Sequence, residues 1–148
     1  MSSNLQNLYR QVIMDHYKNP RNKGLISDAG YHDVHLRNPT CGDDVTISIK
    51  MDDDVIKDIR HEGTGCAICC SSASVMSETL VEKEVGDAVR LAHQFYDIVK
   101  GEEVLGDVED MGDAFVYQGV SQFPARIKCA TIAWKAFEQG ISELKEGK

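Results

Sequence analysis

The segment VTISIKMDDDVIKDIRHEGTGC, residues 45–66, carries the pattern that decides the fold. Its first half alternates apolar and polar side chains, which predicts a strand with one buried face. Residues 52–54 are three aspartates and indicate a turn, and residues 55–61 then repeat the two-residue period. Because the connection is short, the two strands are expected to pair antiparallel. The apolar positions of the first strand are Val45, Ile47, Ile49 and Met51.

The regions on either side of this hairpin complete an α+β pattern. Residues 31–36 indicate one more strand, so the sheet is expected to be a three-stranded antiparallel meander. Residues 102–119 are acidic and are expected to be partly loop. The fold prediction is a small sheet packed with an N-terminal helix and a C-terminal group of helices. Apolar spacing and the Pro and Gly positions predict helices over residues 5–18, 66–82, 87–99 and 124–144.

Length and charge exclude several classes of protein. The chain has 148 residues, which suits a single domain over residues 1–148. Acidic residues number 24 and basic residues 16, so the formal charge of −8 argues against binding to a nucleic-acid backbone. The absence of a long apolar run and of an apolar N-terminal segment predicts a cytoplasmic protein without a membrane partner.

Five cysteines in a reducing compartment indicate metal ligands or reactive thiols. Cys41 is expected in a turn between two strands, Cys66 at the start of a helix, and Cys129 near the start of the last helix. Asp43 lies two residues after Cys41, so three thiolates and one carboxylate would fill the four positions of a tetrahedral zinc site. Spacing alone leaves the alternative that the cysteines are small buried hydrophobic residues, because paired C-x-x-C knuckles are missing.

Three cysteine motifs closely resemble those of the SufU family within the IscU-like superfamily. They are NPTCGD (38–43), GTGCAI (63–68) and FPARIKCAT (123–131), and the N-terminal stretch DHYKNPRN (15–22) is similar to the same family. IscU-like scaffolds carry a His directly before the third cysteine, where this chain has Lys128. SufU-like chains also carry an insertion between the second and third cysteines, which the acidic segment at 102–113 resembles. Both features favour the SufU branch.

The resemblance implies both the site and its chemistry. Cys41, Asp43, Cys66 and Cys129 would bind Zn²⁺, and Cys41 would accept persulfide sulfur from a SufS-type cysteine desulfurase, a His of which takes the vacated zinc position. The implied function is a zinc-dependent sulfurtransferase that supplies downstream iron–sulfur assembly proteins. Arg126 stands three residues before Cys129 and is expected to steady the thiolates or orient the persulfide. Two alternatives stay open, a scaffold for a [2Fe–2S] cluster and a structural zinc protein that only activates a partner.

Cys69 and Cys70 depart from the family pattern, which has Ser or Thr followed by Met or a small residue. Both lie one helical turn after Cys66, so they are expected on or beside its face. One interpretation is an inert pair that fills space, and the other is a spare ligand or a redox partner for Cys66. The five histidines have no ligand spacing between them and are expected to be ordinary surface or core residues.

Overall fold

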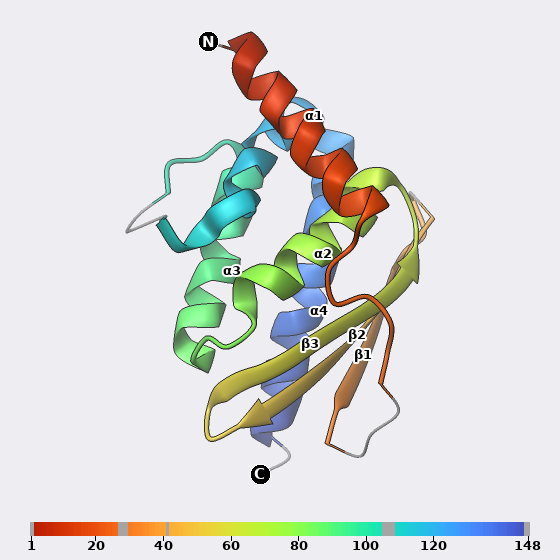
Figure 1. The fold of residues 1–148 in the computed structure, drawn as a ribbon, viewed down its shortest axis with the longest axis vertical. Helices are drawn as coiled ribbons and strands as arrows, with labels where there is room; N and C mark the ends of the chain where they lie inside the picture. The colour runs from red at the N-terminus through yellow and green to blue at the C-terminus, as the bar shows by residue number, and fades with distance from the viewer. Residues whose placement is uncertain (1, 27–29, 41, 105–108, 147–148) are drawn as a thin grey trace.

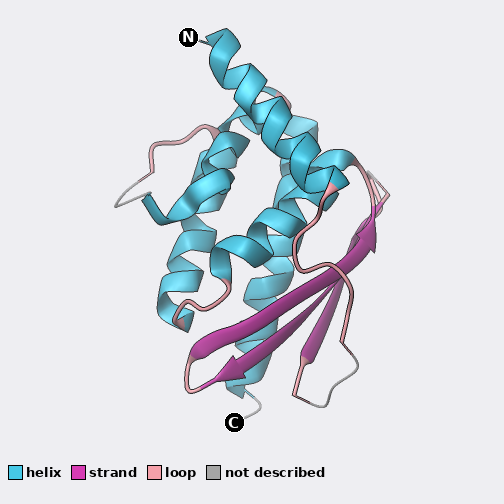
Figure 2. Ribbon diagram, in the orientation of Figure 1, coloured by secondary structure: helices cyan, strands magenta, loops and turns pink. Residues whose placement is uncertain are grey.

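The computed structural model describes residues 2–26, 30–40, 42–104 and 109–146, and shows helices packed beside one small sheet (Figures 1 and 2). The α+β prediction is therefore confirmed. In chain order the elements are α1 (Ser2–Lys18), β1 (His32–Asn38), β2 (Asp43–Asp52), β3 (Val55–Thr64), α2 (Ala67–Leu80), α3 (Val85–Lys100), η1 (Glu109–Gln122), η2 (Pro124–Arg126) and α4 (Ile127–Glu146), where η denotes a 3₁₀-helix.

The sheet is the expected antiparallel meander in the order β1-β2-β3. Ile47 pairs with Val34 on one side and with His61 on the other. Of the predicted inward positions of β2, Val45, Ile47 and Ile49 are almost completely buried and Met51 is partly buried. Asp53 and Asp54 form the two-residue turn between β2 and β3 with φ angles of 48° and 63°. Positive φ at both positions matches the right-handed twist of the two strands, which is why the hairpin closes so tightly.

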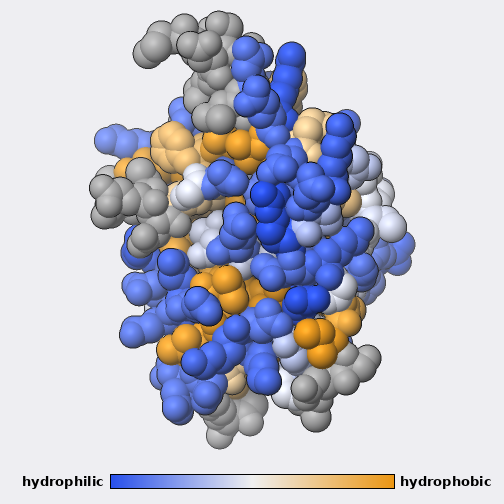
Figure 3. Space-filling view, in the orientation of Figure 1, coloured by the Kyte–Doolittle hydropathy of each residue, from blue (hydrophilic) through white to orange (hydrophobic). Residues whose placement is uncertain are grey.

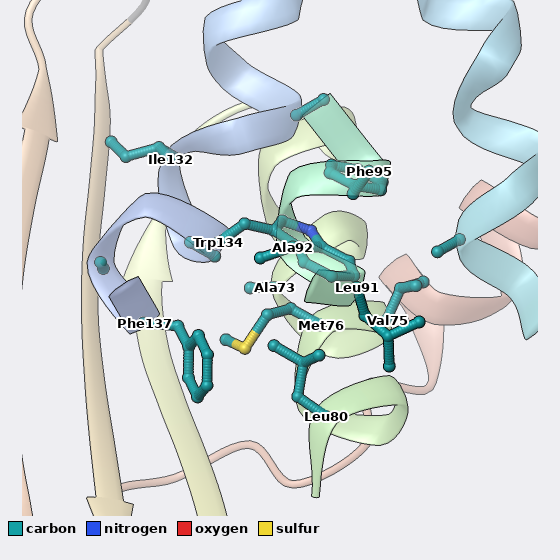
Figure 4. Close-up of a cluster of buried hydrophobic side chains, with 14 of the residues drawn as sticks. Ala73, Val75, Met76, Leu80, Leu91, Ala92, Phe95, Ile132, Trp134 and Phe137 are labelled. Atoms are coloured by element: carbon teal, nitrogen blue, oxygen red, sulfur yellow. The ribbon is translucent and has the colours of Figure 1, made fainter. Parts of the chain in front are cut away.

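Helix α2 lies at the centre of the helical half and brings the sheet and the other helices together. It packs against α1, α4 and η1 and against strand β3, while α4 packs along β1 and β2 (Figure 1). The rings of Phe95 and Trp134 stack with centroids 4.0 Å apart between α3 and α4 (Figure 4). Trp134 Nε1 also donates a hydrogen bond to the buried Ser72 Oγ of α2 (3.0 Å), which fixes α4 on the central helix.

The segment before α4 differs from its prediction. Residues 102–119 were expected to be partly loop, but a 3₁₀-helix runs from Glu109 to Gln122, with a kink at Gly112. Its four completely buried side chains recur every three residues, which is the period of a 3₁₀-helix, and Val116 is also buried, at 7% exposure. The predicted start of the last helix at Pro124 is also wrong, because residues 124–126 form a separate 3₁₀ turn and α4 begins at Ile127. The completely buried positions are Met111, Ala114, Tyr117 and Val120.

The surface is mainly hydrophilic, and the face in Figure 3 shows separate apolar patches rather than one continuous one. Among the described residues, every helix is too short or too polar to cross a bilayer. The large apolar side chains that are more than a third exposed are Met14, Tyr17, Leu25, Ile26, Phe115 and Phe123.

Candidate metal centre

Three of the four expected metal ligands meet at one place. Asp43 is the first residue of β2, Cys66 is the N-cap of α2, and Cys129 is the third residue of α4. One ligand atom from each lies within 4.8 Å of the other two. Cys41, the fourth expected ligand and the expected sulfur acceptor, lies outside the described residues. The fold thus brings together residues that are distant in the sequence.

Asp43 is held in place by donors from two sides. Its side chain is almost completely buried, at 2% exposure. Asn38 Nδ2 donates to one carboxylate oxygen and the Cys66 backbone N–H donates to the other, both over 3.3 Å. A Cβ atom on Gly65 would lie 2.5 Å from Asp43 Oδ1, so only glycine permits this close approach. These contacts fix the direction of the carboxylate before any ion binds.

The two thiols of the group lie at helix starts. Cys66 is half-buried and has an extended backbone (φ −72°, ψ 168°), while Cys129 is fully buried. The partial positive charge at a helix N-terminus favours the thiolate form of a nearby cysteine. A tetrahedral zinc ion with bonds of about 2.0–2.3 Å places its ligand atoms about 3.3–3.8 Å apart. Two thiols and a carboxylate within 4.8 Å therefore fit zinc with only small side-chain adjustments.

Arg126 stands three residues before Cys129, and Tyr9 is a further residue near this group. Arg126 is exposed in the 3₁₀ turn before α4, as expected for a residue that a partner can reach. Burial and then the negative charge of Cys66 raise the pKa of Tyr9, while Arg126 opposes the rise. Tyr9 therefore lies within electrostatic reach of both. Sequence reasoning missed Tyr9 and Asn38, although Asn38 belongs to the first cysteine motif.

Cys69 and Cys70 differ in burial, although both line the same pocket. The Cys69 side chain is fully buried, and the Asp43 carboxylate lies within electrostatic reach of its thiol. Burial and the negative charge of Asp43 raise the pKa of Cys69 strongly. Cys70 is half-buried, and its thiol lies 3.8 Å from the Gly65 carbonyl oxygen on the wall of a pocket of about 270 Å³. The two thiols are therefore not an equivalent buried pair.

A second group of potential ligands consists of His16, Glu78 and Asp113. The His16 side chain is fully buried, and both of its ring nitrogens are engaged, Nδ1 with Ser74 Oγ and Nε2 with Asp113 Oδ2, each over 2.8 Å. Glu78 faces the guanidinium of Arg21 at 3.7 Å. These contacts satisfy the group within the protein, in agreement with the expectation that His16 is a structural residue.

The sequence that forms this centre matches a known protein family. The family model described as the NifU-like N-terminal domain matches residues 8–130. The chain belongs to this family, which confirms the expected IscU-like relationship.

Within the family the chain is similar to SufU proteins. It is 47% identical over 146 residues to the zinc-dependent sulfurtransferase SufU of Bacillus subtilis (strain 168), covering 99% of this chain and 97% of the relative. A crystal structure of FiSufU from Fervidobacterium islandicum AW-1 superposes with a TM-score of 0.76 and 30% identity, over 90% of this chain and 96% of that one. The chain is also 40% identical to the iron–sulfur cluster assembly scaffold protein IscU of Streptococcus pyogenes serotype M1, covering 94% and 86%.

Proposed function

We propose that this protein is a zinc-dependent sulfurtransferase of iron–sulfur cluster assembly. The observation that carries the proposal is the meeting of Asp43, Cys66 and Cys129 at one buried point, in a chain 47% identical to a zinc-dependent SufU. Cys41 is the proposed fourth ligand and the sulfur acceptor. When bound, zinc keeps its thiolate ligands deprotonated and holds them close together.

The proposed reaction is a thiol exchange with a persulfide on a SufS-type cysteine desulfurase. The Cys41 thiolate attacks the outer sulfur of that persulfide, a new S–S bond forms on Cys41, and the desulfurase cysteine leaves as a thiolate. The reaction needs no external oxidant. Cys66 and Cys129 stand at the starts of α2 and α4 and would stay in place, whereas the sequence predicts Cys41 in a turn, which suits a ligand that departs.

Arg126 is the proposed second catalytic residue. Arg126 is exposed in the 3₁₀ turn that precedes Cys129, where a partner that carries a persulfide could reach it. A cation at this point would stabilise the negative charge that moves between the two sulfurs. The downstream acceptors proposed are other iron–sulfur assembly proteins, and the proposed location is the cytoplasm, where thiols stay reduced.

The competing function is that of a scaffold for a [2Fe–2S] cluster on the same side chains. The observation in its favour is the 40% identity to a protein named as an IscU scaffold, and thiolates bind iron as well as zinc. Against it, the exposed Lys128 stands directly before Cys129, where the scaffolds that the sequence resembles carry a His.

Two measurements on one preparation separate these functions. Elemental analysis should give about one zinc per chain in a colourless protein, and the chain should accelerate alanine release by a SufS-type desulfurase. A Cys41→Ser variant should lose this acceleration. A brown protein with iron and acid-labile sulfide in place of zinc would support the scaffold, and full acceleration by Cys41→Ser would show that the chain only activates its partner.

A further inference from the structure

The pocket of about 270 Å³ beside the metal centre has no part in the proposed sulfur transfer. Its lining comes from the end of α1, the connection that follows it, the end of β3 and the first half of α2. Gly65 belongs to this lining, and the same residue packs against the Asp43 carboxylate. The pocket and the metal centre therefore share one wall. The volume suits a small organic molecule, since drug-sized ligands occupy about 300–1,000 Å³.

The ring of His61 offers this pocket a hydrogen-bond acceptor that the protein does not use. His61 lines the pocket and is only 4% exposed. Its Nε2 lies 2.7 Å from the Arg21 carbonyl oxygen, which can only accept, so Nε2 carries the hydrogen and Nδ1 the lone pair. Within the described part of the chain, Nδ1 has no donor. His16 also lines the pocket, but both of its ring nitrogens are engaged.

Lys23 supplies a positive charge at the edge of the same pocket. It is exposed, lines the pocket and forms a backbone bridge with His61, where the connection after α1 lies along β3 (Figure 1). Its charge reaches the His61 ring, because it adds to the burial that lowers the pKa of this histidine. Among the described residues, no carboxylate forms an ion pair with Lys23. The pocket thus combines a buried acceptor, a cation and the apolar side chains of Val45 and Ala73.

We propose that this pocket binds a small α-amino acid as its zwitterion. The ammonium group of the ligand donates a hydrogen bond to His61 Nδ1, its carboxylate faces the ammonium group of Lys23, and its side chain lies against the apolar lining. An amine without a carboxylate would meet the charge of Lys23 without compensation. A carboxylate without an amine would leave His61 Nδ1 without a donor. A molecule that carries both groups on one carbon satisfies both residues.

The site goes beyond the proposed sulfur transfer, which uses neither His61 nor Lys23. Cysteine is consumed and alanine is released in the desulfurase reaction with which the chain is proposed to work, so both small amino acids are present where it acts. This choice of amino acid rests on the proposed function, whereas the arrangement of the pocket does not. Alanine is the cleaner probe, because it lacks a thiol that would compete for zinc.

Titration of the full chain with L-alanine, followed by the amide NMR signals, tests the site without any substitution. We expect saturable shifts at residues 61–65 and 69–73, with a dissociation constant of about 1 mM or lower. Propionate lacks the ammonium group and ethylamine lacks the carboxylate, so each should bind about tenfold more weakly or worse. The absence of saturable alanine binding, or equal binding of all three compounds, would overturn the proposal.

Two substitutions assign the groups that recognise the ligand. Lys23→Gln removes the charge at an exposed position and should weaken alanine binding about tenfold. His61→Gln retains a side-chain donor for the Arg21 carbonyl oxygen but removes the acceptor, and should weaken binding about fivefold or more. Lys57→Gln is the matched control, because Lys57 is exposed in β3 and lies outside the pocket lining. Equal alanine binding by Lys23→Gln and Lys57→Gln would overturn the role of Lys23.

The zinc content and the acceleration of the desulfurase, measured on the same preparation, keep this proposal separate from the proposed function. A chain that contains zinc and accelerates the desulfurase but does not bind alanine would overturn the pocket alone. A chain that binds alanine in the pocket but contains no zinc would retain the pocket and overturn the proposed function. Shifts confined to Asp43, Cys66 and Cys129 would place the amino acid at the metal centre and would also overturn the pocket.

Discussion

The group of Asp43, Cys66 and Cys129 and the group of His16, Glu78 and Asp113 both bring three ligand atoms within 4.8 Å of one another. Their surroundings are different. In the second group the His16 ring is engaged at both nitrogens and Glu78 faces a guanidinium, so the charges already have partners inside the protein. In the first group two thiols stand at helix N-termini beside a carboxylate that accepts hydrogen bonds from the Asn38 amide and the Cys66 backbone N–H.

This difference shows that spacing alone does not define a metal site. An ion at His16 would have to replace a strong hydrogen bond and compete with Arg21 for Glu78, whereas an ion between the two thiols would be bound by the soft sulfur ligands that zinc prefers. The softness of the donors then selects zinc over magnesium or calcium, which prefer oxygen. Separate substitutions in the two groups therefore test whether the first group binds zinc and the second does not.

The largest effect is expected from removing a thiol of the first group. Cys66→Ser should lower zinc affinity about a hundredfold or more, since structural zinc sites contribute about 10–16 kcal/mol through four ligands. Competition with a chelator measures this, and the melting temperature should fall because the folded state loses its bound ion. Glu78→Gln is the matched control in the second group and should leave zinc affinity unchanged. Equal zinc loss from both variants would remove the distinction between the groups.

An intermediate effect, on folding alone, is expected from His16→Ala. The substitution leaves Ser74 and Asp113 without their partner and opens a cavity beneath α1, which should cost about 2–4 kcal/mol of unfolding free energy. Urea denaturation measures it, and the zinc content should remain about one per chain. His93→Ala removes an exposed contact to Glu138 and should cost about 0.5 kcal/mol or less. Loss of zinc from His16→Ala would contradict the structural role of this residue.

The smallest effect is expected from Gly65→Ala, which acts on the position of Asp43. The added methyl group would meet the carboxylate oxygen and turn it away from the ion, so zinc affinity should fall about tenfold. A chelator titration resolves a change of this size. Gly86→Ala adds the same methyl group in α3, where nothing lies within 4 Å, and should behave like the wild-type protein. Indistinguishable titrations for the two variants would mean that the position of the Asp43 carboxylate does not depend on Gly65.

Much of the fold follows from local pattern. The alternation in β2 and the aspartate turn after it were sufficient to predict the hairpin, and Gly101 ends α3 in the left-handed conformation with φ 76°, as its position predicts. The segment over Glu109–Gln122 was missed because its completely buried residues recur every three positions. A three-residue period is shorter than the α-helical period by which helices were predicted. The acidic residues that precede this segment also suggested a loop.

The candidate site could be predicted as a set of residues but not as an arrangement. The motifs around Cys66 and Cys129 indicated two helix starts, and only the packing of α2 and α4 on the sheet shows that they converge on Asp43. The different surroundings of Cys69 and Cys70 could not be predicted either. The two residues are adjacent in the sequence, and the surroundings of each thiol depend on which side of the first turn of α2 faces the interior of the protein.

The central claim is that Cys41 accepts sulfur while Cys66, Cys129 and Asp43 hold the metal ion. Mass spectrometry of peptides from the chain, after incubation with a SufS-type desulfurase and cysteine, tests this claim most directly. The account predicts one added sulfur atom on the peptide that contains Cys41, and none anywhere in a Cys41→Ala variant that retains its fold. Sulfur found only on peptides containing Cys66, Cys69, Cys70 or Cys129 would contradict it.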